Sequence, residues 1–225
     1  WSGLAAGLSM GFSFVAEALL RAALPDEPWR PLISKLGYSV GFLIVILGRQ
    51  QLFTENTLTP ILPLLSRRTM DVFMNVLRLW VIVLITNLLG ALVFAWVLGN
   101  TDAFKPDVQK AFGDVGREAL QVDFWQALIR GVFAGWLIAL MVWLLPAAET
   151  ARHWIIIIIT YIVGLGGLTH IIAGSVETFY MGVTEQAAWG QILSTYTLPT
   201  LIGNIVGGVA LVAAFNHAQV VSGKE

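Results

Sequence analysis

The stretch GRQQLFTENT, residues 48–57, ends an apolar run with a polar break, and THIIAGSVET, residues 169–178, does the same in the second half of the chain. An Asn-Leu-Leu-Gly motif follows the first break at Asn87, and Asn-Ile-Val-Gly follows the second at Asn204. Interrupted hydrophobic segments at corresponding places in two halves are the best pointer in a sequence to a membrane transport site. The two stretches therefore predict a transport path between paired helix breaks.

The spacing of the polar residues supports this pairing of the two halves. Thr54 lies 33 positions before Asn87, and His170 lies 34 positions before Asn204. An unpaired backbone group costs several kcal/mol in hydrocarbon, so broken helices persist only where protein or a water-filled cavity satisfies them. We therefore expect residues 49–57 and 170–178 to meet around His170 and to enclose a narrow path within each protomer.

Composition places the chain in a membrane. Of its 225 residues, 57% are hydrophobic and 12% are charged, against about 25% charged in an average soluble domain. The mean hydropathy is +0.77. The net charge of -1 gives no reason to expect a nucleic-acid partner, and there is no Cys for a disulfide or a thiolate site. Catalytic, phosphate-binding and metal-ligand motifs are also missing from the sequence, so we expect no enzyme, no cofactor and no metal.

The hydrophobic segments predict an all-α membrane protein with six crossings. They lie at about residues 1–24, 33–65, 79–101, 124–145, from 153 to the break at 170, and 191–215. Only 13 uncharged residues separate Lys35 from Arg49, which gives about 20 Å of helix against a hydrocarbon thickness of about 30 Å. This segment is therefore a half-helix, completed by residues 58–65. Residues 100–123 form a polar loop with a short amphipathic helix on the membrane surface.

Small residues follow both asparagines. Gly90 follows Asn87, and Gly207 and Gly208 follow Asn204. Such residues let helix backbones approach closely in membranes, which predicts helix packing at these positions. Six crossings put both termini on one side of the membrane, and the basic residues at 67 and 68, in the tightest connection, favour the cytoplasmic side.

Four motifs together resemble the formate/nitrite transporter family. They are Leu52-Phe53-Thr54, the stretch NLLGAL from Asn87, Gly167-x-x-His170, and Gly203-Asn204-Ile205-x-Gly207-Gly208. They occur in order and with fitting spacing, and the similarity extends from residue 1 to about residue 215. The departures described below indicate a divergent branch of bacterial inner-membrane proteins.

The resemblance implies an aquaporin-like fold in one transmembrane domain, residues 1–225. Two inverted three-helix repeats, approximately 1–100 and 119–218, have broken second and fifth helices and flank the surface loop at 100–123. The resemblance also implies a homopentamer in the membrane lipid, with one pore in each subunit. That pore would pass small monovalent anions such as formate, nitrite or hydrosulfide.

The resemblance also assigns the pore residues. A central His, here His170, lies between two apolar constrictions, and a mobile loop in the second helix supplies Leu52, Phe53 and Thr54. The outer constriction falls on Tyr38, Phe42 and Val163. An ionisable side chain in the middle of a membrane is a functional candidate. We hypothesise that His170 passes a proton to the anion, which then crosses the apolar constrictions as a neutral acid.

Several charged positions depart from the family. Ala119 stands where the family has a Lys, and Thr169 where it has a Glu. New charges are Arg49, Glu55 and Glu177. Carboxylates near a pore repel anions, unless Arg49 pairs with Glu55 or with Glu177 and cancels their field.

Other ionisable residues, Glu17, Arg78 and Arg130, lie closer to span ends, where we expect their side chains to reach the interface. Three functions remain open. The first is a passive or proton-linked channel for small monovalent anions. The second is the same scaffold conducting a cation or a small neutral solute. The third is a membrane scaffold protein with a closed pore.

Overall fold

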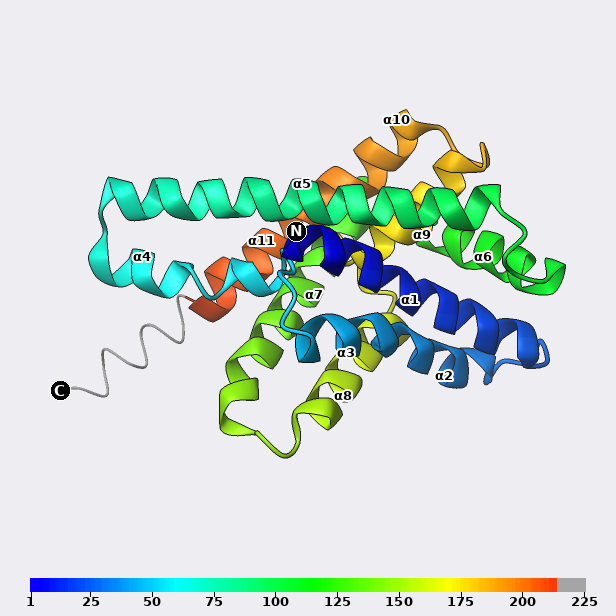
Figure 1. Cartoon of the computed structure of the whole chain (residues 1–225), viewed down its shortest axis with the longest axis horizontal. Coiled ribbons are helices and arrows are strands. Elements are labelled where there is room, and N and C mark those ends of the chain that lie inside the picture. The colour runs from blue at the N-terminus through cyan, green and yellow to red at the C-terminus, as the bar shows by residue number, and fades with distance from the viewer. Residues whose placement is uncertain (214–225) are drawn as a thin grey trace.

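The computed structural model describes residues 1–213, with side chains through residue 209, and all regular secondary structure in that part is helical (Figure 1). The α-helices are α1 (Ser2–Ala23), α2 (Arg30–Ser34), α3 (Ser39–Leu47), α4 (Ile61–Arg67), α5 (Met70–Asn100), α6 (Pro106–Ala119), α7 (Phe124–Leu144), α8 (Arg152–Leu165), α9 (Ala173–Val183), α10 (Trp189–Gln191) and α11 (Leu198–Ile205). Short 3-10 turns η1 (Lys35–Tyr38), η2 (Glu55–Thr57) and η3 (Leu145–Ala147) and π-helical turns η4 (Ile192–Thr197) and η5 (Val206–Ala213) connect or extend them. The last two residues of the predicted sixth span lie outside the described part.

Five helical segments within residues 1–213 are long and apolar enough to cross a membrane. They are Ser2–Ala23, Arg30–Leu47, Met70–Asn100, Phe124–Ala147 and Trp189–Val209. The apolar helix α8 is shorter, with 14 residues. The all-α membrane architecture predicted from the hydrophobic segments is therefore confirmed.

Both helix interruptions are present. The first separates α3 from α4 and contains only the 3-10 turn η2. The second separates α8 from α9 and covers residues 166–172, because α9 already begins at Ala173. The prediction of a break over residues 170–178 was therefore placed a few residues too late. Polar residues 175, 177 and 178, which suggested the later position, lie inside the buried helix α9.

Local sequence sets several helix ends. The Asp123 side chain accepts a hydrogen bond from the backbone N–H of Gln126, and the Gln126 Oε1 accepts one from the backbone N–H of Asp123. This capping box satisfies two N–H groups that have no partner inside α7. At the C-terminal end of α1, the backbone of Leu24 is extended because the following residue, Pro25, disfavours a helical conformation.

Close backbone contact holds α1 on α5, and α7 on the continuous helical segment of α11 and η5. A Cβ at Gly7 would lie 2.1 Å from the carbonyl oxygen of Asn87, and one at Gly207 would lie 2.0 Å from that of Val132. Gly90 packs in the same way against the α1 backbone. No side chain fits at these points, so the two helix pairs are as close as backbones can come.

Helix α6 corrects one prediction. Its apolar face does not lie on the membrane but packs on α1 and α9 (Figure 1). The Phe112 ring lies 4.9 Å from the Phe14 ring of α1 and 5.6 Å from the Tyr180 ring of α9, measured between centroids. An amphipathic pattern predicts that one face is buried, and here protein rather than lipid buries it.

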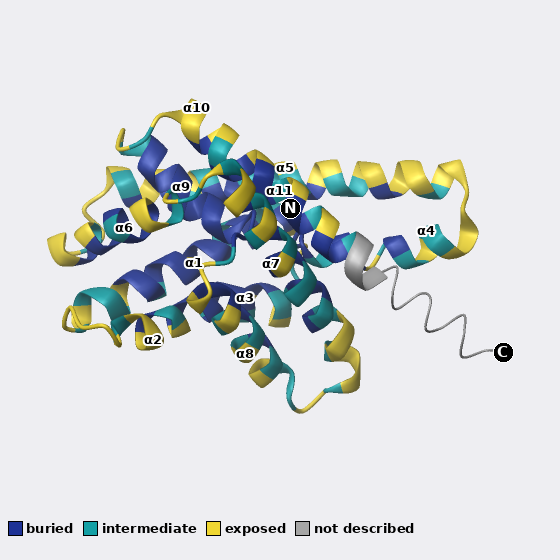
Figure 2. Ribbon diagram, turned by 180° about the vertical axis from the view of Figure 1, so that it is seen from behind, coloured by how far each residue is buried: buried dark blue, intermediate teal, exposed yellow. Residues whose placement is uncertain are grey.

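Helix α5 begins earlier than predicted. Its first residue is Met70, so Arg78 lies within the helix, on an exposed face. Together α4 and the first half of α5 form a hairpin that extends from the body of the molecule, and most of its surface is exposed (Figure 2). Its apolar outer face, with Phe73, Leu77 and Val81, is suited to contact lipid or a neighbouring subunit.

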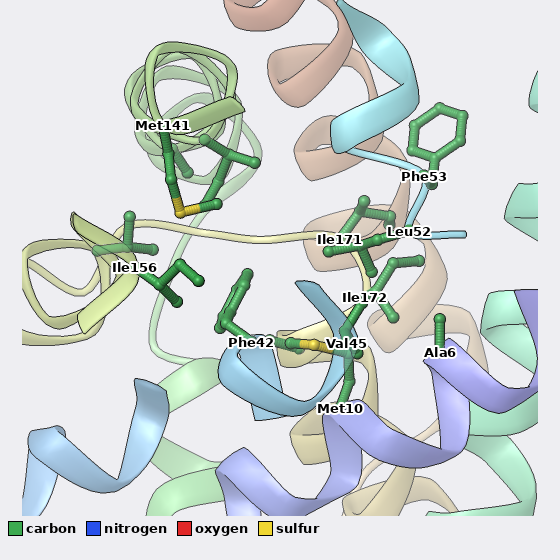
Figure 3. Packing of buried hydrophobic residues seen from close by; sticks show 14 of the residues in the cluster. Ala6, Met10, Phe42, Val45, Leu52, Phe53, Met141, Ile156, Ile171 and Ile172 are labelled. Atoms are coloured by element: carbon green, nitrogen blue, oxygen red, sulfur yellow. The ribbon is translucent and has the colours of Figure 1, made fainter. Parts of the chain in front are cut away.

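The largest hydrophobic cluster surrounds the two breaks. Leu52 and Phe53 come from the first break, and Ile171 and Ile172 from the second (Figure 3). They pack with residues of α1, α3, α7 and α8, and all four are at most 1% exposed. The core of the molecule therefore lies where its helices are discontinuous.

Candidate functional site

Asn87 of α5 holds the first break in place. Its Oδ1 accepts a hydrogen bond of 2.9 Å from the backbone N–H of Phe53, and its Nδ2 donates to the carbonyls of Gly3, at 2.7 Å, and Gln51, at 2.9 Å. One buried amide thus satisfies two backbone groups of the break that have no helical partner and also ties the break to α1.

Asn204 of α11 holds the second break with the same set of bonds. Its Oδ1 accepts from the N–H of Ile171 at 2.9 Å, and its Nδ2 donates to the carbonyls of Gly131 and Thr169, both at 2.9 Å. We refer to the two arrangements as the asparagine clamps. The clamps go beyond the helix-packing role predicted for these two residues.

The clamps define which residues of the two breaks correspond. Leu52 lies between the two clamped residues of the first break, and His170 lies between those of the second. The similar chain distances of Thr54 and His170 from the asparagines, 33 and 34 positions, suggested that these two residues correspond, and that register is off by two residues. It compared the polar residue of each break.

His170 and Thr54 meet at the centre of the cluster. Both are fully buried, and His170 Nε2 lies 2.8 Å from Thr54 Oγ1. His170 Nδ1 accepts hydrogen bonds from the backbone N–H groups of Ile172, at 3.3 Å, and Ala173, at 3.1 Å. Since Nδ1 is an acceptor, the proton of the neutral imidazole is on Nε2, and Nε2–H donates to Thr54.

Aromatic side chains enclose this pair on the α3 side. The Phe42 ring lies 5.0 Å from the His170 ring at an interplanar angle of 77°, and the Tyr38 ring lies 5.5 Å from the Phe42 ring. Val163 of α8 belongs to the same cluster, and all three residues are buried. The structure thus gathers Tyr38, Phe42, Val163, Leu52 and Phe53 around one polar contact.

A cavity of about 230 Å³ lies beside the second break, and we refer to it as the tyrosine cavity. Two cations, Lys35 and Arg130, and two carboxylates, Glu118 and Glu177, line it. The other lining residues are Tyr38, Val115, Ala119, Val122, Gly164, Leu165, Gly167, Leu168, Thr169 and Tyr196. Polar hydroxyl groups and balanced charges therefore cover the approach to the His170 pair from this side.

Lys35 reaches the tyrosine cavity from a buried ion pair with Glu17 of α1. The Glu17 side chain is completely buried, and Lys35 Nζ is its ionic partner. One turn further along α1, Arg21 pairs with Glu118 of α6 at 2.6 Å. The prediction that Glu17 reaches the interface was wrong, because η1 and α6 cover this face of α1 and supply its partners.

Ala119 and Thr169 also line the tyrosine cavity. These are the positions at which the resemblance leads one to expect a Lys and a Glu. Lys35 and Glu177 now supply an ammonium and a carboxylate to the same space. An ammonium and a carboxylate therefore line this cavity from other positions of the chain.

Arg49 does not pair with either glutamate. None of the ion pairs among the described residues includes Arg49, Glu55 or Glu177. Arg49 lines a second cavity of about 300 Å³ with Arg152, whereas Glu177 lines the tyrosine cavity. The alternative in which Arg49 cancels the charge of a glutamate is therefore wrong, because Arg49 follows the end of α3 and Glu177 lies in α9, at a different cavity.

Sequence reasoning missed Tyr196. A Cβ at Gly174 would lie 1.6 Å from the Tyr196 hydroxyl oxygen, so the phenol occupies the space that any side chain at 174 would need. Tyr196 is buried and lines the tyrosine cavity. Its signal in the sequence is weak, since a Tyr in an apolar span is common. The packing role of Gly208 is similar, because a Cβ there would lie 2.1 Å from Thr57 Oγ1.

The fold and site define a class of membrane protein in which two clamped helix breaks meet around one polar contact inside the chain. A family model for the formate/nitrite transporters matches residues 1–218. The chain belongs to the formate/nitrite transporter family and is an integral protein of the inner membrane. The family is one of channels and transporters.

Individual relatives agree with this assignment. The chain is 40% identical over 220 residues to inner membrane protein YfdC of Escherichia coli, and the alignment covers 98% of this chain and 71% of that protein. It is 25% identical over 245 residues to formate channel FocA of Haemophilus influenzae, over 96% of this chain and 84% of that one. A solved pentameric formate channel with formate bound superposes with a TM-score of 0.83 at 21% identity, over 98% and 95% of the two chains. This last match shows a shared fold.

Proposed function

We propose that this protein conducts small monovalent anions of the formate, nitrite and hydrosulfide type through a pore in each protomer. The observation that carries the proposal is the 2.8 Å contact between His170 Nε2 and Thr54 Oγ1, which joins the two helix breaks inside an apolar cluster. Membership of a transporter family and the formate channels among the relatives support it.

The apolar side chains would act as gates. Leu52 and Phe53 of the first break belong to the same buried cluster as Tyr38, Phe42 and Val163, and we propose that the two groups flank the polar contact. A hydrophobic constriction excludes water and lets a solute through only when it loses most of its hydration shell. The polar contact at the centre would replace part of that hydration.

Thr54 is the group best placed to bind the anion. Its Oγ1 accepts the Nε2–H of His170, so its own hydroxyl hydrogen remains available to donate. Proton linkage through His170 would need a proton at Nδ1. That proton would break the two hydrogen bonds that Nδ1 accepts from backbone N–H groups. We therefore propose that His170 mainly orients Thr54, and that a proton crosses, when it does, on the anion itself.

The assembly we propose is a homopentamer, as in the solved formate channel that shares this fold. Each protomer would have six crossings in two inverted repeats, approximately residues 1–100 and 119–218, within one domain. The matching asparagine clamps support this division. Both termini would lie in the cytoplasm, and the exposed apolar faces would contact lipid and neighbouring subunits.

A second candidate is conduction of a cation or a small neutral solute. The unpaired carboxylate of Glu177 in the tyrosine cavity favours it, since carboxylates near a pore attract cations. Lys35 and Arg130 line the same cavity and balance its carboxylates, so membership of the family and the formate channels among the relatives make anion passage the better supported reading.

The first experiment measures flux in proteoliposomes. Uptake of labelled formate and nitrite is recorded for the wild type, Thr54→Val and His170→Asn, with His153→Asn as a control at an exposed histidine. A hydrogen bond to a charged group contributes about 1.5–3 kcal/mol, so we expect Thr54→Val to lower flux about 10- to 100-fold. Wild-type flux in both Thr54→Val and His170→Asn would show that the path lies elsewhere.

Two further measurements separate the alternatives. A reversal potential that follows the formate gradient supports the anion channel, and one that follows a potassium gradient supports the cation reading. If His170→Asn keeps the wild-type pH dependence of flux at a reduced rate, His170 orients Thr54. If the pH dependence disappears with the imidazole, His170 carries the proton itself and the orienting role is wrong.

A further inference from the structure

Arg49 occupies a backbone position that favours glycine. Its φ is 51°, in the left-handed region, and it follows the end of α3. The equivalent residue after α8 is Gly167, with a φ of 58°. A non-glycine residue in this conformation costs on the order of 1–2 kcal/mol.

The two helix ends are otherwise the same. After α3, the N–H of Gln50 bonds to the carbonyl of Val45 at 2.9 Å, and after α8 the N–H of Leu168 bonds to that of Val163 at 3.0 Å. Each is the six-residue bond of a Schellman motif, in which glycine is the usual left-handed residue. Helix termination therefore does not explain why residue 49 is an arginine.

The Arg49 side chain lines the cavity of about 300 Å³ mentioned above, which we refer to as the arginine cavity. Arg152 lines it too, with its Nε donating to the carbonyl of Leu145 at 3.4 Å. The other lining residues are Ile46, Leu47, Val142, Leu145 and Pro146. The described part of the chain contributes two guanidinium groups and no carboxylate to this cavity.

The arginine cavity adjoins the apolar gate. Ile46 and Leu145, which line the cavity, also pack against the cluster that contains Leu52 and Ile156. An anion held in the cavity would therefore lie next to the gate and would already have lost part of its water. Two fixed positive charges with apolar walls raise the local concentration of anions.

We propose that the arginine cavity is a binding site for a small oxyanion, held by the guanidinium groups of Arg49 and Arg152. The proposal rests on the proposed function and deepens it, because it identifies where the anion waits before it passes the gate. Guanidinium groups offer several N–H donors in a plane, which matches the two oxygens of a carboxylate or nitrite. The backbone strain at Arg49 is retained because the side chain is needed at this place.

The test compares two arginines with the same backbone conformation. Arg68 also has a φ of 51°, but it does not line the arginine cavity. The half-saturating formate concentration is measured from each side of oriented vesicles for the wild type, Arg49→Gly, Arg152→Gln and Arg68→Gly. We expect a rise of about tenfold for the first two variants on one side only, since the loss of one charged hydrogen bond costs at least about 1.4 kcal/mol. We expect no change for Arg68→Gly.

Direct binding separates this proposal from the proposed function. Formate and nitrite should raise the melting temperature of the purified wild type by more than that of Arg49→Gly, in which only the Thr54 contact remains, and neutral formamide should have no effect on either. If the wild type binds formate in this way but conducts no anion, the proposed function fails and the site stands. If the wild type conducts anions and both Arg49→Gly and Arg152→Gln keep its half-saturating concentration, the site fails and the function stands.

A lipid phosphate has the same chemistry as a small oxyanion, so the vesicle composition is varied. The measurements are made in zwitterionic phosphatidylcholine vesicles and again with added anionic phosphatidylglycerol. An unchanged difference between the wild type and Arg49→Gly supports a free anion. A difference that appears only with phosphatidylglycerol means that a lipid headgroup occupies the cavity, and the proposal is then wrong.

Discussion

The two helix breaks share one framework and differ in a few side chains. Each follows a helix that ends in a left-handed residue, and each is held by one asparagine with three hydrogen bonds. Within that framework, Leu52 corresponds to His170, and Arg49 corresponds to Gly167. The shared part builds the breaks, and the differing positions carry the chemistry that we propose.

The two cavities differ in the same way. The tyrosine cavity has two cations and two carboxylates, whereas the arginine cavity has two cations and no carboxylate among its described lining residues. The two breaks therefore share a backbone framework, whereas the cavities beside them differ in charge. A scaffold of this kind can treat the two directions of transport differently while keeping the same central contact.

The largest effect should come from removing a clamp. Asn87→Ala leaves two backbone groups of the first break, the Phe53 N–H and the Gln51 carbonyl, without a partner, and Asn204→Ala does the same to the Ile171 N–H and the Thr169 carbonyl. Each unsatisfied group costs about 1–3 kcal/mol, so we expect each variant to lose on the order of 3 kcal/mol or more. Thermal unfolding of the purified protein in detergent measures the loss.

Asn100→Ala is the control for both clamps, because Asn100 is exposed and bonds only to the carbonyl of Trp96 in its own helix. It should unfold like the wild type. The comparison of the breaks predicts similar losses for the two clamp variants. A loss at Asn87→Ala with none at Asn204→Ala would mean that only one break depends on its asparagine.

The buried ion pair at the tyrosine cavity gives the next effect. Glu17→Gln leaves the Lys35 ammonium without its counter-charge, and breaking a buried pair costs about 3–5 kcal/mol. Lys35 keeps 19% of its side chain exposed, so we expect the lower end of that range. The double variant Glu17→Met with Lys35→Met should recover most of the stability.

Asp26→Asn is the matched control for that pair. The Asp26 carboxylate binds Arg30 at 2.6 Å but is 87% exposed, and exposed pairs contribute about 0–1 kcal/mol. Both sets of variants are measured by thermal unfolding. Equal losses for Glu17→Gln and Asp26→Asn would mean that water reaches Glu17.

The sequence was sufficient to predict the two helix breaks but not the side-chain contacts between the helices. The 13 uncharged residues before Arg49 were too few to span a membrane, and that shortage predicted the first break. The partner of Glu17 could not be predicted, because it depends on which face of α1 meets η1. The same holds for the direction of the Arg49 side chain, since a residue number does not tell which cavity a helix end faces.

The central contact was predicted through motifs and not through geometry. His170 and Thr54 were named together, but the chain gave no information on the tautomer, which the N–H groups of Ile172 and Ala173 decide. The role of α6 was also beyond reach, because an apolar stripe shows that a face is buried and not what buries it.

Helix contact at the two glycines should give a smaller effect. A Cβ at Gly90 would lie 2.6 Å from a carbonyl oxygen of α1, and one at Gly207 would lie 2.0 Å from a carbonyl oxygen of α7. Overpacking of this kind costs about 1–3 kcal/mol, so Gly90→Ala and Gly207→Ala should both destabilise the protein to thermal unfolding. Gly190→Ala, with open space around it, should not, and a loss there would point to a backbone effect.

The smallest effect tests the two left-handed positions directly. Gly167→Ala should cost about 1–2 kcal/mol, because alanine would have to adopt the φ of 58°. Arg49→Ala should change stability little, since the strain is already present, and Arg49→Gly should be neutral or stabilising by less than about 1 kcal/mol. Thermal unfolding of the three variants separates structure from function at residue 49. A loss of more than about 1 kcal/mol in Arg49→Gly would mean that the arginine is retained for packing. A neutral or stabilising change, with weaker anion binding, would mean that the strain serves the arginine cavity.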